Sequence, residues 1–174
     1  MRKWIGYYQN IISDDLCSKL IEYSDNQKPL QPSTYSTSSG KSDRSNERVK
    51  MDDGWFRNGE QYYNDIKNCF MTVIKKYREK HTDFVCQRHT DFRLNKYSVD
   101  GFMSKHIDNI HHSHGQQYGY PQVSALLFLN DDYEGGEFIV ADVEYTTKKG
   151  SAIIFPSNFM FPHEVKIIKK GTRY

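Results

Sequence analysis

Cysteine is scarce in this chain, which has three, Cys17, Cys69 and Cys86, among its 174 residues. The number is odd, no two are spaced as Cys-x-x-Cys, and two fall on the apolar faces of expected helices. This pattern implies no disulfide framework and predicts reduced thiols that pack as small hydrophobic side chains. It also disfavours a tetrahedral zinc site, which usually needs several closely spaced Cys or His ligands.

Long hydrophobic runs are missing as well. No apolar stretch approaches the roughly 20 residues that span a bilayer, and the N-terminal segment MRKWIGYYQN has no signal-peptide core. The mean hydropathy of -0.81 indicates a very polar surface. We therefore expect a soluble, cytoplasmic protein without membrane attachment.

Neither sign of charge is in strong excess, because the formal net charge is +2. The basic clusters at Lys148–Lys149 and Lys166–Lys170 are short and interrupted, so nucleic-acid binding is not indicated. A positive rim of this kind is able to attract an anionic small molecule or an acidic protein segment. Its simplest interpretation is a solvated face.

The length fits one domain with a sizeable core. A helix is expected from about Asp14 to Ser24 with Ser13 as its N-cap, and a second from about Gly59 to Lys80 after an Asn58-x-x-Gln61 capping box. Between them, residues 31–50 are rich in Ser, Thr, Gly and charge, which predicts a mobile loop. Beside a catalytic site such a loop would serve as a substrate lid, and plain flexibility is the alternative.

Short strands dominate the second half of the chain. They are expected at Phe92–Ser98, Phe102–Ile107, Val123–Asn130, Glu137–Val140, Ser151–Phe155 and Phe161–Ile168. The run from Val123 to Leu129 is apolar on both alternating faces, as in a strand between a barrel interior and a layer of helices. The sequence therefore predicts a mostly β fold with some α, a jelly roll (double-stranded β-helix) braced by N-terminal helices. Residues 1–81 would form the helical support and loop, and residues 84–174 the core.

The residues most indicative of chemistry are His106-x-Asp108, His163 and Arg173. Two imidazoles and one carboxylate bind one face of a ferrous ion and leave three adjacent positions open for a chelating cosubstrate and dioxygen. The planar, permanently charged fork of Arg173 suits a carboxylate at a fixed distance from that metal, as in 2-oxoglutarate. A return strand beginning near Gly171 would set this arginine beside His163 on an antiparallel ladder.

Other histidines compete for the metal role. His89-Thr-Asp91 has the same His-x-Asp pattern, and in a strand either pair presents both side chains on one face. The second pair is preferred because it closes a strand that leads into a polar loop. The nearby segment His111-His112-Ser-His114 is best interpreted as an exposed loop that binds metal adventitiously.

The chain also resembles a known family through a series of motifs. They are Ile12-Ser-Asp-Asp-Leu-Cys17, Arg93-Leu-Asn-Lys-Tyr97, Gly101-Phe102, His106-x-Asp108, Leu126-Leu-Phe-Leu-Asn130, Asp131-Asp-Tyr-Glu-Gly-Gly-Glu137, Gly150-Ser-Ala-Ile-Ile-Phe-Pro156, His163-Glu-Val165 and Gly171-Thr-Arg173. Their order and intervals are similar to those of the iron(II)- and 2-oxoglutarate-dependent dioxygenases. The similarity is greatest to the prolyl 4-hydroxylase-like branch, which includes prolyl and lysyl hydroxylases.

The resemblance implies a role for each matching residue. His106, Asp108 and His163 would bind iron(II), and Arg173 would pair with the distal carboxylate of 2-oxoglutarate. Tyr97 would hydrogen-bond the cosubstrate, with a core aromatic as the alternative. Some relatives have a tyrosine where Phe128 stands, so one hydrogen bond to the cosubstrate would be either missing or supplied by Ser124. Dioxygen is the co-reactant that this resemblance implies, with ascorbate as an optional addition.

The resemblance also implies the reaction and its substrate. The metal carboxylate Asp108 favours hydroxylation, because the related halogenases lack it to make room for halide. A prolyl residue of a peptide or protein would lie between the 31–50 and 109–122 loops. Lysyl residues, free amino acids and other small molecules are alternative substrates. An alternative function of a different class is a catalytically silent, metal-binding jelly-roll module. The family has a last core strand after this arginine, so we expect either a clipped chain or a neighbouring segment that covers the open edge.

Overall fold

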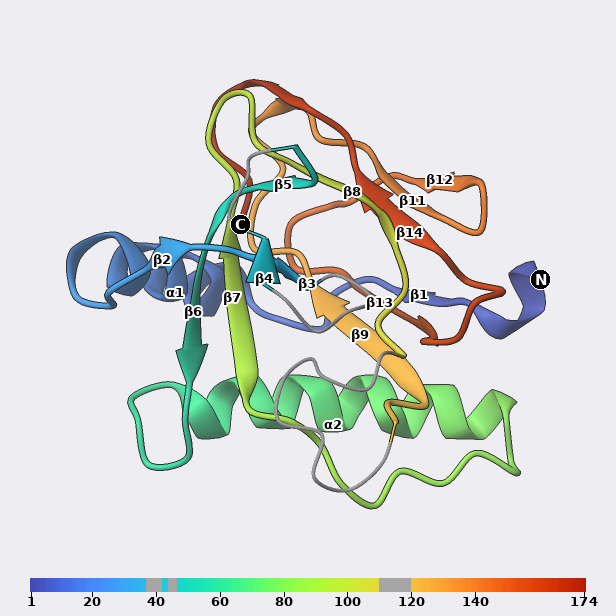
Figure 1. Cartoon of the computed structure of the whole chain (residues 1–174). Helices are drawn as coiled ribbons and strands as arrows, with labels where there is room; N and C mark the ends of the chain where they lie inside the picture. The colour runs from blue at the N-terminus through green and yellow to red at the C-terminus, as the bar shows by residue number, and fades with distance from the viewer. Residues whose placement is uncertain (37–41, 44–46, 110–119) are drawn as a thin grey trace.

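The computed structural model of this chain describes residues 1–36, 42–43, 47–109 and 120–174. Strands outnumber helices in these ranges, as predicted (Figure 1). A 3-10 turn at Arg2–Trp4 is followed by the helices α1 (Asp14–Asn26) and α2 (Tyr63–Lys80). The strands are β1 (Gly6–Tyr8), β2 (Gln31–Pro32), β3 (Tyr35–Ser36), β4 (Ser42–Asp43), β5 (Val49–Lys50), β6 (Asp52–Phe56), β7 (Phe92–Lys96), β8 (Phe102–His106), β9 (Val123–Leu127), β10 (Glu134–Gly135), β11 (Phe138–Val140), β12 (Val143–Tyr145), β13 (Ala152–Pro156), β14 (His163–Val165) and β15 (Ile168–Lys170). No described helix is both long and apolar enough to span a membrane.

The first helix begins where the sequence predicts it. The Ser13 hydroxyl accepts a hydrogen bond from the Leu16 amide at 3.2 Å, which satisfies one of the free N–H groups of the first turn. Its inner face buries Cys17 and Leu20. The helix then continues to Asn26, two residues beyond the predicted end.

The predicted start of the second helix is wrong. The helix begins at Tyr63 rather than near Gly59, and its N-cap residue Tyr62 has no capping hydrogen bond from its side chain. Gly59 has φ +93 and Tyr62 has φ +65, and neither angle occurs within a right-handed helix. The capping box at Asn58 and Gln61 is therefore not formed, because the chain turns through these residues before it becomes helical.

Two antiparallel sheets position the candidate site. The larger has the order β12-β11-β14-β8-β5, and the other has the order β1-β13-β9. Between them lies a hydrophobic cluster that includes Phe138 of β11 together with Ile153 and Phe155 of β13. The site residues come from β8, β14 and the segments that follow them, at one side of this cluster.

The helix α2 covers the outer face of the β1-β13-β9 sheet (Figure 1). Val73 and Tyr77 pack there against Ala152 and Ile154, with Val123, Ala125 and Leu127 of β9 beside them. Leu126, which alternates with these residues, packs against the inner cluster. This arrangement confirms that β9 is apolar on both faces because helix and core lie on opposite sides of it.

Two sequence expectations about extended segments need correction. The predicted strand from Phe161 to Ile168 is two strands, because β14 pairs with β8 and β11 whereas β15 pairs with β10. The predicted loop at residues 31–50 contains β2, which pairs with β6, and β5, which pairs with β8. These two-residue strands are held by distant partners, so local composition does not reveal them. Residues 37–41 and 44–46 of this predicted lid lie outside the described residues.

A gap separates β7 from β9. At one end of it, Arg173 exchanges two 2.9 Å main-chain hydrogen bonds with Tyr97, and the Leu129 amide donates to the Tyr174 carbonyl at 3.3 Å. In the described part of the chain, β7 otherwise pairs with β6 alone and β9 with β13 alone. Residues 173 and 174 therefore lie between two sheet edges that face each other.

Candidate metal centre

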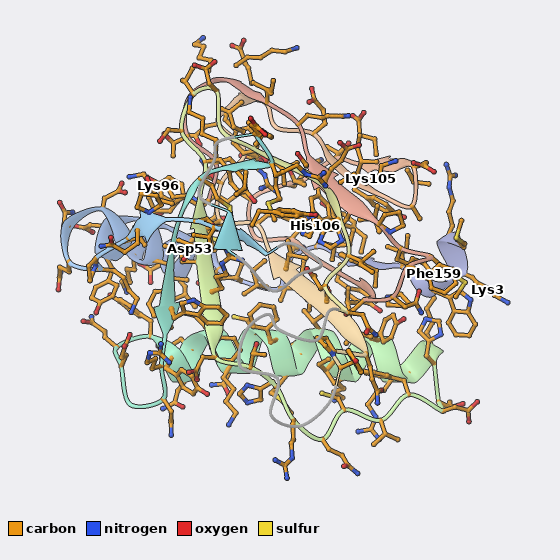
Figure 2. The ribbon with its side chains drawn as sticks, in the orientation of Figure 1. Lys3, Asp53, Lys96, Lys105, His106 and Phe159 are labelled. Atoms are coloured by element: carbon orange, nitrogen blue, oxygen red, sulfur yellow. The ribbon has the colours of Figure 1, made fainter. Side chains whose placement is uncertain are left out.

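His106 and His163 are brought together by strand pairing. His106 is the last residue of β8, His163 is the first of β14, and the two are directly opposite in the antiparallel register. Opposite residues project their side chains to the same face of a sheet, and the two imidazole centroids are 4.2 Å apart. Figure 2 shows His106 near the middle of the molecule, next to β14.

Asp108 completes a three-residue cluster. Its Oδ1 lies 3.5 Å from His106 Nε2, and its Oδ2 lies 3.5 Å from His163 Nε2. Each residue offers one ligand atom, and these atoms lie within 4.8 Å of one another. Two imidazole nitrogens and one carboxylate at this spacing can bind one divalent ion and leave its other positions free.

The competing His-x-Asp pair has no such arrangement. His89 stacks on Phe92, its Nδ1 contacts the Thr90 carbonyl at 2.7 Å, and Asp91 lies 3.4 Å from Arg57. Among the residues that the structure describes, only the cluster of His106, Asp108 and His163 gathers three potential ligands. The segment His111–His114 lies outside the described residues.

Hydrogen bonds orient the ligand atoms. His106 Nδ1 contacts the Ser104 carbonyl at 2.8 Å, so this nitrogen carries the proton and Nε2 keeps its lone pair toward Asp108. The Ser124 hydroxyl donates to Asp108 Oδ2 and contacts Ser157 Oγ at 2.9 Å. These contacts fix the carboxylate without using its other oxygen.

Asn109 anchors the segment that carries Asp108. Its amide donates to the Ser157 carbonyl at 3.1 Å, and its side chain donates to the Pro121 carbonyl at 3.2 Å. Sequence reasoning missed both Asn109 and Ser157. In the sequence, Asn109 directly follows Asp108, and Ser157 directly follows the Ile-Ile-Phe-Pro strand. These positions alone do not reveal that the two residues are in contact.

Burial and charge hold the ligands in metal-binding forms. Burial alone would raise the pKa of the Asp108 carboxyl, but the neighbouring His106 and His163 side chains and the hydrogen bond from the Ser124 hydroxyl outweigh it and leave that pKa far below its ordinary value. Burial lowers the pKa of His163 to about 4. A carboxylate and a neutral imidazole are the forms that bind metal, so the donor set fits a divalent ion such as iron(II).

Arg173 is a buried cation without an acidic partner. The residue is 4% exposed, and no carboxylate of the described residues lies within 4.0 Å of its guanidinium. Its Nε donates to the Tyr133 hydroxyl at 3.2 Å, and its guanidinium carbon lies 5.2 to 5.8 Å from the ring centres of Tyr97, Phe128 and Phe138. Because an unpaired buried charge is costly, this surrounding is suited to receive an anion.

The predicted partner of Arg173 is wrong. The sequence argument placed it beside His163 on one ladder, whereas its main chain pairs with Tyr97, after the end of β7. The ring of Phe138 lies near both side chains, with its centre 6.0 Å from that of His163 and 5.8 Å from the guanidinium carbon of Arg173. Arg173 and the cluster nevertheless line one cavity of about 410 Å³.

Tyr97 and Ser124, expected to bind a cosubstrate, both line this cavity. Tyr97 is buried and its ring faces Arg173. The Ser124 hydroxyl is engaged with Asp108 and Ser157. The cosubstrate roles of Tyr97 and Ser124 stay predictions.

Comparison with known sequences identifies relatives of the second half of the chain. Residues 92–174 match the family model of the 2OG-Fe(II) oxygenase superfamily. A PKHD-type hydroxylase from Crocosphaera subtropica is 37% identical over 87 residues, which cover 47% of this chain. The chain spans only 38% of the length of that relative.

Solved structures with a similar fold match nearly the whole chain. A prolyl-4-hydroxylase from Pseudomonas putida has a TM-score of 0.70 and 17% identity, and the match covers 98% of this chain and 88% of that one. A prolyl hydroxylase from Trichoplax adhaerens, in complex with a peptide fragment of hypoxia inducible factor, has a TM-score of 0.75 and 17% identity, with 99% and 80% covered. At these identities the likeness concerns the fold.

Proposed function

We propose that this chain, whose residues 92–174 match the family model of the 2OG-Fe(II) oxygenase superfamily, is an iron(II)- and 2-oxoglutarate-dependent dioxygenase that hydroxylates an unactivated C–H bond. The substrate we infer is a prolyl residue in a peptide or protein. Residues 1–174 would form one catalytic domain, a double-stranded β-helix supported by the two helices. The fold of the prolyl hydroxylase structures supports this architecture.

The observation that carries the proposal is the pairing of two incomplete sites in one cavity. The cluster of His106, Asp108 and His163 offers a metal three ligands on one side, and the buried Arg173 lacks an anion. A molecule with a metal-chelating end and a distal carboxylate satisfies both requirements at once. 2-Oxoglutarate has these two ends, and a monocarboxylate would leave one site unsatisfied.

Each protein group then has a defined task. The cluster would hold iron(II), while Ser124 and Ser157 keep the Asp108 carboxylate in place. Arg173 would bind the distal carboxylate of the cosubstrate with its terminal nitrogens, and Phe138 and Phe155 would exclude water from around His163. The bound metal and cosubstrate would supply dioxygen activation, and the protein supplies position and shielding.

The prolyl assignment rests on the relatives. Two solved structures of similar fold are prolyl hydroxylases, and one of them holds a peptide fragment. The carboxylate ligand Asp108 supports hydroxylation because it occupies the place a halide would need. Lysyl residues and free amino acids are the alternative substrates of the same chemistry.

The deciding experiment measures succinate formation from 2-oxoglutarate by iron-loaded protein in air, with and without proline-containing peptides. We expect peptide-stimulated succinate and a peptide mass gain of one oxygen atom. Matched variants are Asp108→Ala, which should be inactive, and Asp91→Ala, which should behave as the wild type. A protein that retains iron yet forms no succinate would be a metal-binding module instead of an oxygenase.

A further inference from the structure

The Tyr133-Glu-Gly-Gly136 segment is the part of the family-like motifs that the metal centre does not use. It consists of β10 with one residue on either side, and it lies next to Arg173. The Tyr133 hydroxyl accepts the hydrogen bond from Arg173 Nε at 3.2 Å and lies 2.6 Å from Thr147 Oγ1. Tyr133 is partly buried and packs against the inner cluster. One phenol therefore joins the candidate anion-binding arginine to a third segment of the chain.

The direction of the hydrogen bond between Arg173 and Tyr133 follows from the groups involved. An arginine Nε–H only donates, so the Tyr133 oxygen must accept from Arg173. The Tyr133 and Thr147 hydroxyls are 2.6 Å apart, and either one can be the donor of the hydrogen bond between them. These two hydrogen bonds link Arg173, Tyr133 and Thr147, and they leave both terminal nitrogens of Arg173 for a ligand.

The aromatic surroundings do not define this orientation by themselves. Rings at 5.2 to 5.8 Å attract the guanidinium over a broad range of angles. The hydrogen bond to Tyr133 is directional and therefore restrains rotation of the guanidinium plane. Without it, the same charge would remain in the cavity with less defined geometry.

Gly136 makes the approach of Arg173 possible. Its φ is +66, and a Cβ at this position would lie 2.3 Å from Ile168 Cδ1, 3.3 Å from Tyr133 Cε2 and 3.4 Å from Arg173 Cδ. Any larger residue would displace Ile168 and crowd both members of the hydrogen bond. The spacing Tyr133-x-x-Gly136 thus supplies a hydroxyl and the room for the arginine to reach it.

We propose that Tyr133, held by Thr147, is a positioning residue that orients Arg173 and so sets the length of dicarboxylate that the cavity accepts. This inference rests on the proposed function. A fixed guanidinium defines one distance between the metal and the distal carboxylate, which suits a five-carbon keto diacid. A rotating guanidinium would tolerate a diacid that is one methylene longer.

The test compares Tyr133→Phe and Thr147→Val with the wild type, and Tyr145→Phe is the matched control. Tyr145 belongs to the same cluster but contacts Tyr7 instead of Arg173. Two readouts are needed: 2-oxoglutarate binding to the Mn(II)-loaded protein by calorimetry, and KM and kcat for 2-oxoglutarate and 2-oxoadipate with saturating peptide.

For Tyr133→Phe we expect about tenfold weaker 2-oxoglutarate binding, as for the loss of one hydrogen bond to a charged group. The kcat should change by less than about twofold, and the preference for 2-oxoglutarate over 2-oxoadipate should fall. Thr147→Val should lower the affinity for 2-oxoglutarate and the preference for it over 2-oxoadipate by smaller amounts. Tyr145→Phe should change neither the affinity nor the preference. The milder Thr147→Val decides the matter if Tyr133→Phe does not fold.

Unchanged affinity and unchanged discrimination in the folded variants would overturn the inference. A loss of kcat with unchanged affinity would also overturn it, because a positioning role acts on cosubstrate binding. A wild-type protein that neither binds 2-oxoglutarate nor forms succinate would instead refute the proposed function. The two failures are therefore distinguishable.

Discussion

Arg173 is held by the neutral hydroxyl of Tyr133, 40 residues away in the sequence, and not by a carboxylate. A buried arginine in an ion pair has its charge neutralised within the protein. Here the hydrogen bond fixes Nε while the positive charge stays available. Orientation and charge are therefore supplied by different groups, which is the property that a recognition site for an anion requires.

Replacing Arg173 with lysine should weaken 2-oxoglutarate binding by about 10- to 100-fold. Lysine keeps the charge but lacks the planar fork and the Nε donor that meets Tyr133. Calorimetry with Mn(II)-loaded protein measures the change directly. The control is Arg57→Lys, because Arg57 is an exposed arginine that forms an ion pair with Asp91. Equal affinities in the two variants would contradict the role assigned to Arg173.

Asp108→Ala should abolish succinate formation and weaken iron binding. Removal of the carboxylate leaves two imidazoles and no charge to offset that of the metal. Binding is measured by equilibrium dialysis against iron(II) under anaerobic conditions. Unaltered turnover in Asp108→Ala, or lost turnover in Asp91→Ala, would show that the other His-x-Asp pair is the metal site.

Ser124→Ala should reduce metal affinity by about 10-fold, at the lower end of the range for groups that orient metal ligands. The hydroxyl donates to the carboxylate oxygen of Asp108, so its loss frees that carboxylate to rotate. Ser124→Thr restores the hydroxyl and should recover most of the affinity. Ser18→Ala, on the exposed face of α1, is the control for serine loss. Equal metal affinity in wild type and Ser124→Ala would exclude the orienting role.

The metal-free protein should lose stability as the pH falls from 7 to 5. His163 has a pKa of about 4 in the folded state because it is buried, whereas an unfolded histidine titrates near 6.5. The unfolded chain therefore binds a proton first, and stability is complete above about pH 6.5 and declines toward pH 4. Urea unfolding should show that the free energy of unfolding falls by about 1–3 kcal/mol over this pH range, on the scale of such a pKa shift. If the variant His163→Gln showed the same dependence of this free energy on pH, His163 would not be its cause.

One of the three thiols should react under native conditions. Cys86 is exposed, whereas Cys17 and Cys69 are buried. Burial raises the pKa of Cys17 to about 11 and also raises that of Cys69, so neither forms much thiolate near neutral pH. Mass spectrometry after alkylation at pH 7.5 should find one modification in the folded protein and three in denaturant. Rapid labelling of Cys17 in the folded state would show that α1 is not packed as described.

The amino-acid sequence predicts those features that depend on local pattern. The cap of α1 at Ser13 involves only residues within one turn, so the sequence reveals it. The two apolar faces of β9 can likewise be recognised from consecutive residues of the strand. Its prediction that His106 and Asp108 lie together follows from the same period of two. These features need no knowledge of distant segments.

Features that depend on pairing between distant segments could not be obtained in this way. The strands β2 and β5 are two residues long and exist because β6 and β8 pair with them. The contacts of Arg173 with Tyr97 and Tyr133 join three separate parts of the chain. The hydroxyl of Ser124 is likewise engaged by Asp108, a contact that its neighbours in sequence do not indicate.

The gap between β7 and β9 has a consequence for the motions of the cavity wall. Since Tyr97 and Leu129 bond to residues 173 and 174, strand alternation turns the amides of Asn95 and Leu127 toward the gap, while those of Leu94 and Leu126 face β6 and β13. Amide hydrogen exchange along each strand should therefore alternate between fast and slow positions. On this side the cavity is lined by side chains of α2, including Ile66, Phe70 and Ile74, and within the described residues no continuous ladder joins β7 to β9. We therefore expect this wall of the cavity to open more readily than the paired strands.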